Sequence, residues 1–307
     1  MSILVVGATG LVGGQVAQKL RKQGQSVRAL VRGGDAHPKV QPLRAAGIEI
    51  VAGDLTVPET IAPACRGIAT VVTTATSMPT GANDGLRRVD LDGTLALIEA
   101  AERVGVKRFV YTSYSGNIHI DSPLETAKRT CENRLLRSSM QTVILRPTYF
   151  TEVWLSPALG FDFVSGAIRI YGSGEGKGSY ISAFDVADFA VAAVRGKDDE
   201  HTILEMGGPQ PLSQLDAVKI FEQALEKKFQ LEHVPAEALQ QQYSSPDPLQ
   251  KTFGAILLLR PAAVKRSLVL VGEFDLFGDN RAIQSEVIFG NHLHLTHGIP
   301  PRIPTLG

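Results

Sequence analysis

The chain has 307 residues, of which 44% are hydrophobic, and its 31 Lys and Arg residues are balanced by 31 Asp and Glu residues. A chain of this length buries roughly three quarters of its unfolded surface on folding, enough for one large domain or two smaller ones. Because the net charge is zero, no long-range positive field would gather nucleic acid or an anionic membrane surface, and we expect a small-molecule substrate instead.

The two cysteines, Cys65 and Cys131, are too few for a disulfide framework or a paired-cysteine metal site. We therefore expect the protein to act in a reducing cytoplasm. No apolar run approaches the roughly 18 residues that a membrane span needs, so we expect no membrane association. For the assembly state we expect a monomer or a small homo-oligomer.

Short runs rich in Val and Ile alternate with helical stretches through the first half of the chain. This rhythm is typical of a parallel sheet covered by helices on both faces. The predicted strands are residues 3–6, 26–31, 48–52, 70–74, 108–112 and 142–146. The predicted helices are residues 10–23, 38–46, 60–64, 85–104 and 125–138. Glycines that follow three of these helices predict left-handed helix ends at Gly24, Gly47 and Gly105.

The regular pattern loosens after Pro147, where aromatic residues and a glycine-rich segment appear. We divide the chain into a dinucleotide-binding domain, residues 1–150, and a substrate-binding region, residues 151–307. A strand at residues 201–206 and a helix at residues 213–227 are expected to pass between the two, so that the chain crosses back to the first domain around residues 182–227. The fold class is α/β, a doubly wound parallel sheet with a smaller α/β C-terminal region.

Three later features invite a functional interpretation that we do not adopt. The glycines of residues 172–178 precede an extended run rather than a helix, so we expect a loop over the site and no second phosphate loop. Asp185 and Asp188 fit a helix start, where the helix dipole favours acidic side chains. No Asp, Glu or Cys stands near the three histidines His292, His294 and His297, and we expect no metal site there.

The first predicted strand runs directly into a glycine-rich turn and then into a helix. Gly7 permits the tight turn, Gly10 lets the backbone approach a pyrophosphate, and Gly13 allows close packing of helix on strand. A glycine turn that binds nothing is the alternative, but strand, spacing and helix together favour a Rossmann-type dinucleotide site. The expected cofactor contacts in this turn are Gly7, Thr9, Gly10, Leu11, Val12 and Gly13.

The end of the second strand predicts which nicotinamide cofactor is bound. NAD enzymes usually carry Asp or Glu here to bind the ribose hydroxyls, whereas Arg suits the 2′-phosphate of NADP. Arg32 stands in that position, with Asp35 beyond the turn, so we expect NADPH to be preferred over NADH. A solvated surface arginine is the alternative. Asp54 and Leu55 follow the third strand and are expected near the adenine, although a turn aspartate is an equal alternative for Asp54.

These segments, together with KRFVYTS at residues 107–113, Lys128 and ILRPTYF at residues 144–150, resemble an atypical short-chain dehydrogenase/reductase of the NmrA-like and isoflavone-reductase-like branch. The resemblance extends over essentially the whole chain. It implies a Rossmann-type NAD(P)-binding domain, in which Thr74, Ala75, Pro147 and Thr148 also contact the cofactor. It leaves the substrate open, because the family includes reductases, quinone oxidoreductases, sugar-modifying relatives and regulators that only bind the cofactor.

The sequence departs from the wider family at its acid/base tyrosine. The usual Tyr-xxx-Lys pair has become Leu124-xxx-Lys128, so the phenol that protonates a carbonyl oxygen is missing. The resemblance implies that Lys128 binds the nicotinamide ribose or assists proton transfer, and that Ser113 orients the acceptor. A solvated lysine and a loop hydroxyl bonded to backbone are the structural alternatives.

After the sixth strand, Tyr149, Phe150 and Trp154 are expected to form an apolar, partly aromatic wall for the substrate. Ordinary core packing between the two regions is an equal alternative. We therefore expect an NADPH-dependent reductase of a quinone, enone or carbonyl compound. The rival hypothesis is a non-catalytic redox sensor that binds the dinucleotide and communicates with a protein partner, which is consistent with Leu124.

Overall fold

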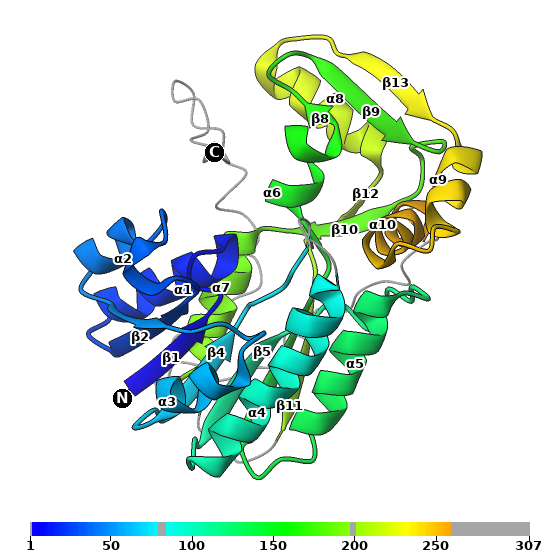
Figure 1. Cartoon of the computed structure of the whole chain (residues 1–307). Coiled ribbons are helices and arrows are strands. Elements are labelled where there is room, and N and C mark those ends of the chain that lie inside the picture. Colours follow the sequence, from blue (N-terminus) through cyan, green and yellow to red (C-terminus); the bar gives the residue numbers. More distant parts are fainter. Residues whose placement is uncertain (1, 79–83, 197–200, 260–307) are drawn as a thin grey trace.

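Seven parallel strands form the main sheet of the computed structural model, which describes residues 2–78, 84–196 and 201–259. In chain order they are β1 (Ser2–Val6), β2 (Ser26–Val31), β3 (Glu49–Ala52), β4 (Thr70–Thr73), β5 (Arg108–Thr112), β6 (Gln141–Pro147) and β11 (Thr202–Met206). Across the sheet their order is β11-β6-β5-β4-β1-β2-β3 (Figure 1). The order reverses between β1 and β4, and open parallel sheets bind ligands outside the carboxyl ends of the strands at such a point.

Helices cover both faces of this sheet. One face carries α1 (Leu11–Lys22), α2 (Gln41–Ala45) and α7 (Ala183–Ala193), and the other carries α3 (Ile61–Cys65), α4 (Thr94–Arg103) and α5 (Pro123–Leu135). Strand side chains alternate between two buried clusters, so that Val5 packs under α1 whereas Leu4 packs toward α3 and α4. Each fully buried aliphatic side chain contributes about 1.5–3 kcal/mol. The dinucleotide-binding half is therefore held by two apolar layers, one on each face of the sheet.

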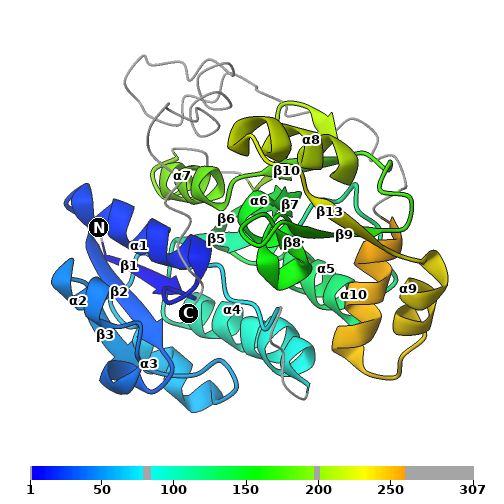
Figure 2. The ribbon, with the colours of Figure 1, turned by 90° about the horizontal axis from the view of Figure 1, so that it is seen from above.

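The smaller region contains two three-stranded sheets, β12-β10-β7 and β13-β9-β8. Its strands are β7 (Tyr149–Phe150), β8 (Phe161–Asp162), β9 (Ala167–Tyr171), β10 (Gly178–Ile181), β12 (Pro211–Leu212) and β13 (Gln230–Val234). Its helices are α6 (Thr151–Trp154), α8 (Gln214–Leu225), α9 (Ala236–Tyr243) and α10 (Pro248–Leu259). Single-turn 3₁₀ segments complete the two regions at Gly34–Ala36, Pro58–Thr60 and Pro157–Leu159. Viewed from above, α10 lies beside α5, so the smaller region touches the sheet half along that helix (Figure 2).

The predicted α/β fold is confirmed, and every predicted strand of the main sheet agrees with the observed one to within one residue at each end. The left-handed ends at Gly24, Gly47 and Gly105 are confirmed by φ angles of 78°, 75° and 81°. Three helix predictions need correction, and one of them is the helix expected at residues 125–138, which covers Pro123–Leu135. The helix expected at residues 38–46 covers only Gln41–Ala45, and the one expected at residues 85–104 begins as the π-helical segment η3 (Leu86–Gly93) before α4.

The chain returns to the main sheet for a shorter stretch than the sequence indicated. Helix α7 packs on α1 and β11 pairs with β6, but α8 packs against β9 and β12 in the smaller region. Asp185 lies in the first turn of α7, as expected. Asp188 lies one turn further on and forms an ion pair with Lys19 of α1, so its role is to join two helices rather than to start one.

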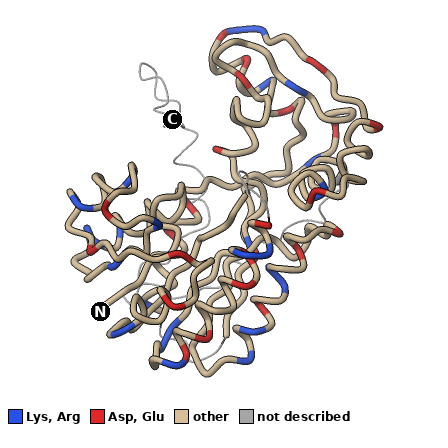
Figure 3. The backbone as a smooth tube through the Cα atoms, viewed as in Figure 1, with Lys and Arg blue, Asp and Glu red and all other residues tan. Residues whose placement is uncertain are grey.

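Positively and negatively charged residues are interspersed along the backbone of both regions (Figure 3). Within the described ranges, every helix falls short of the length and apolar character that a membrane crossing requires. The three histidines of residues 292–297 lie outside the residues that the structure describes.

Candidate functional site

The glycine-rich turn between β1 and α1 is too close to its neighbours for any larger residue. Gly7 has a φ of 88°, in the left-handed region, and a Cβ atom on Gly13 would lie 2.3 Å from the carbonyl oxygen of Gly7. The hydroxyl of Thr74, which follows β4, would lie 2.6 Å from that same Cβ. Gly7 and Gly13 therefore let α1 and the loop after β4 pack closely on the turn, and Thr74 stands directly beside it.

The start of α1 is open to an anion. Exposed Gly10 is the N-cap residue, no side chain caps the helix, and its first turn holds no acidic residue. The first backbone N–H groups of a helix have no intrahelical acceptor and carry the positive end of its dipole. A pyrophosphate fits this arrangement, because it would supply both the missing acceptors and the negative charge.

Arg32 is placed beside the glycine turn by the register of the sheet. Leu30 of β2 lies opposite Val6 of β1, so Arg32 follows β2 at the level where the turn begins. The side chain is exposed, and it forms no ion pair or hydrogen bond with any described residue. Asp35, the nearby acid, is paired with Arg44 of α2. The arrangement leaves Arg32 available for a phosphate, and its role stays a prediction.

Asp54 stabilises a turn, which was one of the two roles that the sequence left open. Its Oδ1 accepts hydrogen bonds from the backbone N–H of Thr56 at 2.8 Å and from the hydroxyl of Thr56 at 2.9 Å. Leu55 is buried, and its carbonyl oxygen would lie 2.6 Å from a Cβ atom on Gly93. These contacts fix the loop after β3, and the proposed adenine contact of either residue stays a prediction.

Lys128 is buried rather than solvated. Only 7% of its side chain is exposed, and its Nζ lies 3.5 Å from Oδ1 of Asp90 and 3.4 Å from the carbonyl oxygen of Thr112, the last residue of β5. The ammonium also lies 5.2 Å from the centre of the Tyr111 ring. The surface alternative for Lys128 is therefore wrong, because the side chain points to the carboxyl end of β5.

Asp90 was missed by the sequence analysis. It is fully buried, and its Oδ2 accepts hydrogen bonds from the backbone N–H and hydroxyl of Ser77 at 2.9 and 2.7 Å. Arginines and a second aspartate surround the residue, so the sequence shows only a charged segment there. The helical period was the available signal, since the buried positions of η3 and α4 include Leu86, Asp90, Gly93, Thr94 and Leu97.

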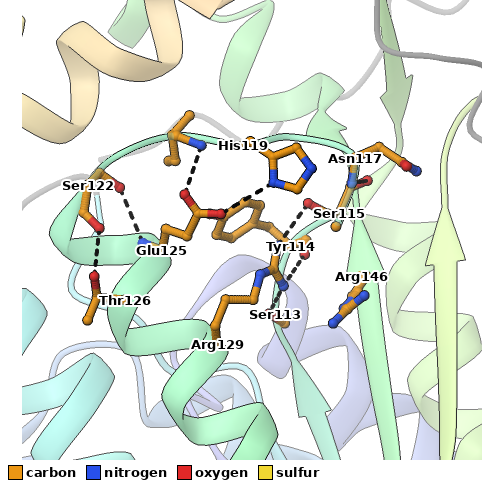
Figure 4. Close-up of polar contacts among 12 residues, drawn as sticks. Ser113, Tyr114, Ser115, Asn117, His119, Ser122, Glu125, Thr126, Arg129 and Arg146 are labelled. Carbon is orange, nitrogen blue, oxygen red and sulfur yellow. Dashed lines mark hydrogen bonds and ion pairs between the residues drawn. The ribbon is translucent and has the colours of Figure 1, made fainter.

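Ser113 lies in the loop after β5, which is fastened to α5 by Arg129 (Figure 4). The Arg129 guanidinium donates to the carbonyl oxygens of Tyr114 and Ser115 at 3.1 and 3.0 Å, and it lies 3.4 Å from the Ser113 hydroxyl oxygen. The guanidinium also covers the Tyr114 ring at 4.5 Å. Ser113 is thus held on the same edge of the sheet as Lys128, and its proposed role toward an acceptor stays a prediction.

Glu132 sits at the centre of the charged network behind this loop. It pairs with Arg129 and with Arg146, each at 2.6 Å, and Arg146 continues to Glu205 at 3.2 Å. Burial alone would raise the pKa of Glu132, but hydrogen bonds from Arg146 and Ser113 and the two arginine charges outweigh it, so the pKa lies below its ordinary value of 4.5. The network holds the loop through fixed charges rather than through a titrating group near neutral pH.

Leu124 is buried at the start of α5, where the family tyrosine would stand. The nearest tyrosine in sequence is Tyr114, whose hydroxyl is buried without a hydrogen-bond partner among the described residues. Burial raises the pKa of this phenol well above its ordinary value, so it stays protonated at neutral pH. The structure therefore offers no ionised phenolate at this position.

The three residues proposed as a substrate wall divide between two clusters. Tyr149 and Trp154 contact each other edge to face at 5.3 Å and join Tyr114 and Tyr180 in an apolar cluster that α10 completes with Ala255 and Ile256. Phe150 instead packs against the main core under α1 and α7. Gly178, which ends the glycine-rich loop, packs on the Tyr149 ring, so that loop lies beside the same cluster.

Pro147 and Thr148 lie at the end of β6, next to this aromatic cluster. Both are buried, and the backbone N–H of Thr148 donates to the carbonyl oxygen of Met206 at 2.9 Å. The hydroxyl of Thr148 is buried without a partner among the described residues. An unpaired buried hydroxyl costs about 1–3 kcal/mol. A bound ligand could supply the hydrogen-bond partner that the Thr148 hydroxyl lacks.

Comparisons with known proteins agree with this geometry. Residues 1–261 match the NmrA-like family. The chain is 30% identical over 237 residues to photosystem II assembly factor Ycf39 of Trieres chinensis, covering 76% of this chain and 72% of that protein. It is 34% identical over 218 residues to the NAD(P)H azoreductase of Xenophilus azovorans, covering 69% of each.

One solved structure extends the likeness to the fold. The triphenylmethane reductase of Citrobacter sp., complexed with NADP(H), superposes with a TM-score of 0.69 at 22% sequence identity, covering 89% of this chain and 93% of that protein. At this identity the likeness concerns the fold alone. The matched part includes both regions of the chain, so the smaller region is a shared feature of that fold as well.

Proposed function

This chain belongs to the NmrA-like family, and we propose that it is an NADPH-dependent reductase of small apolar or aromatic acceptors. The proposal rests chiefly on one observation, the convergence of three groups on one edge of the sheet. The uncapped start of α1, the Thr74 hydroxyl and the Lys128 ammonium lie at the carboxyl ends of β1, β4 and β5. A dinucleotide laid along this edge would meet them in that order, from pyrophosphate to nicotinamide ribose.

NADPH is the favoured cofactor because of Arg32. The register of β1 and β2 brings its exposed guanidinium to the level of the glycine turn, and the neighbouring Asp35 is already paired with Arg44. A charge-assisted hydrogen bond from arginine to a 2′-phosphate contributes on the order of 1.5–3 kcal/mol. NADH lacks that phosphate, so it would gain nothing from Arg32.

The residues at the nicotinamide end would bind and orient rather than form covalent bonds. NADPH supplies a hydride when it is bound. Lys128 would donate hydrogen bonds to the ribose, and Thr148 would find in the cofactor a partner for its buried hydroxyl. Ser113 would orient the acceptor from the loop that Arg129 fastens.

An aromatic acceptor is favoured by the cluster of Tyr149, Trp154 and Tyr114. Aromatic side chains contact a flat, conjugated ligand over a large apolar area and keep their edges for polar contacts. Two similar proteins are named for such acceptors, an azoreductase and a triphenylmethane reductase. We extend that chemical class to this chain, with quinones, enones and aryl carbonyl compounds alongside azo and triarylmethane dyes.

Turnover of NADPH against a panel of these acceptors tests the proposal. The expected result is acceptor-dependent NADPH oxidation by the wild-type protein, and a loss of about tenfold or more in Lys128→Ala with the Arg103→Ala variant unchanged. Arg103 is an exposed cation at the end of α4 and serves as the matched control. Unchanged turnover and cofactor affinity in Lys128→Ala would remove the role that we give to this lysine.

A non-catalytic redox sensor is the second candidate, and Leu124 favours it. The aliphatic side chain cannot act as an acid, and one similar protein is named as a photosystem II assembly factor. A sensor would bind NADPH without oxidising it in the presence of any acceptor of the panel. Saturable NADPH binding without NADPH oxidation by any acceptor of the panel would therefore favour the sensor over the reductase.

A further inference from the structure

Lys128 and Asp90 form an ion pair that is almost closed to solvent. Their side chains are 7% and 0% exposed, and the ammonium nitrogen lies 3.5 Å from Oδ1 of the carboxylate. Removing one partner of such a pair leaves an uncompensated buried charge, which is strongly unfavourable. Each of the two side chains therefore supplies the counter-charge of the other.

The carboxylate of Asp90 is itself fixed from a third element. Ser77, four residues beyond the end of β4, donates its backbone N–H and its hydroxyl to Oδ2. Oδ1 is left without a hydrogen bond among the described residues and faces Lys128. The pair thus joins the loop after β4, the segment η3 and helix α5 at the edge where the cofactor is proposed to bind.

Within the described part of the chain, the other groups found near the ammonium are neutral. They are the ring of Tyr111 and the carbonyl oxygen of Thr112, both from β5, and Cys131, one turn along α5. Burial raises the pKa of Cys131 to about 11, so its thiol carries no charge at neutral pH. Among the described residues, Asp90 is the only carboxylate within ion-pair distance of Lys128.

We propose that Asp90 is a positioning residue, whose buried carboxylate holds the Lys128 ammonium in place at the carboxyl ends of β4 and β5. Lys128 then acts as a hydrogen-bond donor to the nicotinamide ribose. The inference rests on the proposed function, because the ribose in question is that of NADP(H).

A double-mutant cycle tests whether Asp90 acts through Lys128. The variants are Asp90→Asn, Lys128→Met and the two combined, and the measurement is the dissociation constant of NADPH and of NADH. We expect Asp90→Asn to weaken the binding of both nucleotides about tenfold when Lys128 is present, since the ribose is common to both. In the Lys128→Met background we expect the same change to have no effect. An unchanged constant in Asp90→Asn, or an equal loss in both backgrounds, would overturn the proposal.

A matched ion pair separates positioning from general helix packing. Glu102 and Arg134 join α4 to α5 with side chains 28% and 29% exposed, and their contact lies away from the proposed cofactor edge. Glu102→Gln should leave both dissociation constants unchanged. A loss equal to that of Asp90→Asn would show that helix packing alone is responsible.

Two further results keep the test decisive. If Asp90→Asn does not fold, Ser77→Ala removes one hydrogen bond from the carboxylate, and its smaller loss of about two- to threefold should likewise vanish in the Lys128→Met background. Failure of the wild-type protein to bind either nucleotide would contradict the proposed function and this inference together. Binding by the wild type that neither Asp90→Asn nor Ser77→Ala alters would contradict the inference alone.

Discussion

The two regions of the molecule differ in how much of each proposed binding surface comes from consecutive residues. In the main sheet, a strand, a turn and a helix that follow one another build the pyrophosphate end of the proposed cofactor edge, as β1, the glycine turn and α1 do. In the smaller region, Tyr149 pairs with Tyr180 and Gly178 pairs with Leu212, across strands of two to four residues. Local geometry therefore determines the proposed pyrophosphate site, whereas long-range packing determines the proposed acceptor wall.

This difference predicts two separable kinds of variant. Substitutions at the glycine turn or at Arg32 should alter nucleotide binding whatever the acceptor. Substitutions in the aromatic cluster should alter the use of the acceptor and leave nucleotide affinity unchanged.

The largest effect is expected for Gly13→Val. Its Cβ atom would stand 2.3 Å from the backbone oxygen of Gly7, so the turn must move away from the position that admits a pyrophosphate. NADPH affinity should fall by at least about a hundredfold, because the close backbone contacts and the charge at the helix end are lost together. Calorimetric titration measures it.

Gly14→Ala is the control in the same helix turn. A Cβ atom there would meet the oxygen of Ala8 at 3.2 Å, a contact that a small shift relieves. Its affinity should stay within about threefold of the wild type. Equal affinities for NADPH in Gly13→Val and the wild type would refute the assignment of this turn to the cofactor.

Arg32→Ala should narrow the preference for NADPH over NADH by roughly ten- to hundredfold. The change should appear in the NADPH dissociation constant alone, because NADH has no 2′-phosphate for the guanidinium to bind. Arg103→Ala removes the same charge from the end of α4 and should leave the ratio unaltered. An unaltered ratio in Arg32→Ala would mean that another group binds the phosphate.

Trp154→Ala addresses the smaller region. Loss of its edge-to-face contact with Tyr149 and of its aromatic surface should raise the acceptor KM about two- to tenfold, with the NADPH dissociation constant unchanged. Val164→Ala is a suitable control, since that side chain is 72% exposed in the turn between β8 and β9. Steady-state kinetics with a dye or quinone acceptor make the comparison. Weakened NADPH binding in Trp154→Ala would contradict the proposal that the cofactor edge and the acceptor wall act separately.

Glu132→Gln should act on stability and its pH dependence. The pKa of Glu132 is held below 4.5 in the folded protein, so its carboxylate stabilises the fold above pH 4.5, and this contribution is lost as the pH falls through the lowered pKa. At pH 7 the variant should lose about 1–3 kcal/mol of unfolding free energy, and the gap to wild type should shrink below pH 4.5. Denaturant unfolding at a series of pH values measures both. A gap that stays constant down to pH 3 would contradict the role of the charge.

Much of the main sheet could be predicted from sequence because its signals are local. Runs of buried Val and Ile fix the strands, and glycines such as Gly24 and Gly105 mark the helix ends by their left-handed backbone. The π-helical start of residues 85–104 was not predicted, although Gly93 stands where that segment ends and α4 begins. Four of the six small strands have two to four residues, which is too short for a hydrophobic period to specify them.

The candidate site was predicted unevenly for the same reason. The position of Lys128 followed from its motif, but the burial of its ammonium depends on Asp90 and Ser77, 38 and 51 residues away along the printed sequence. The aromatic wall was predicted from the aromatic residues that follow the sixth strand, and this position could not distinguish Phe150, which joins the main core, from Tyr149 and Trp154. Tertiary packing decides which of these side chains enters the main core and which enters the aromatic cluster.

Titration of the wild-type protein with NADPH and NADH is the decisive measurement. We expect one saturable site per chain, with NADPH bound at least about tenfold more tightly than NADH. Absence of binding by either nucleotide, or tighter binding of NADH, would contradict this expectation.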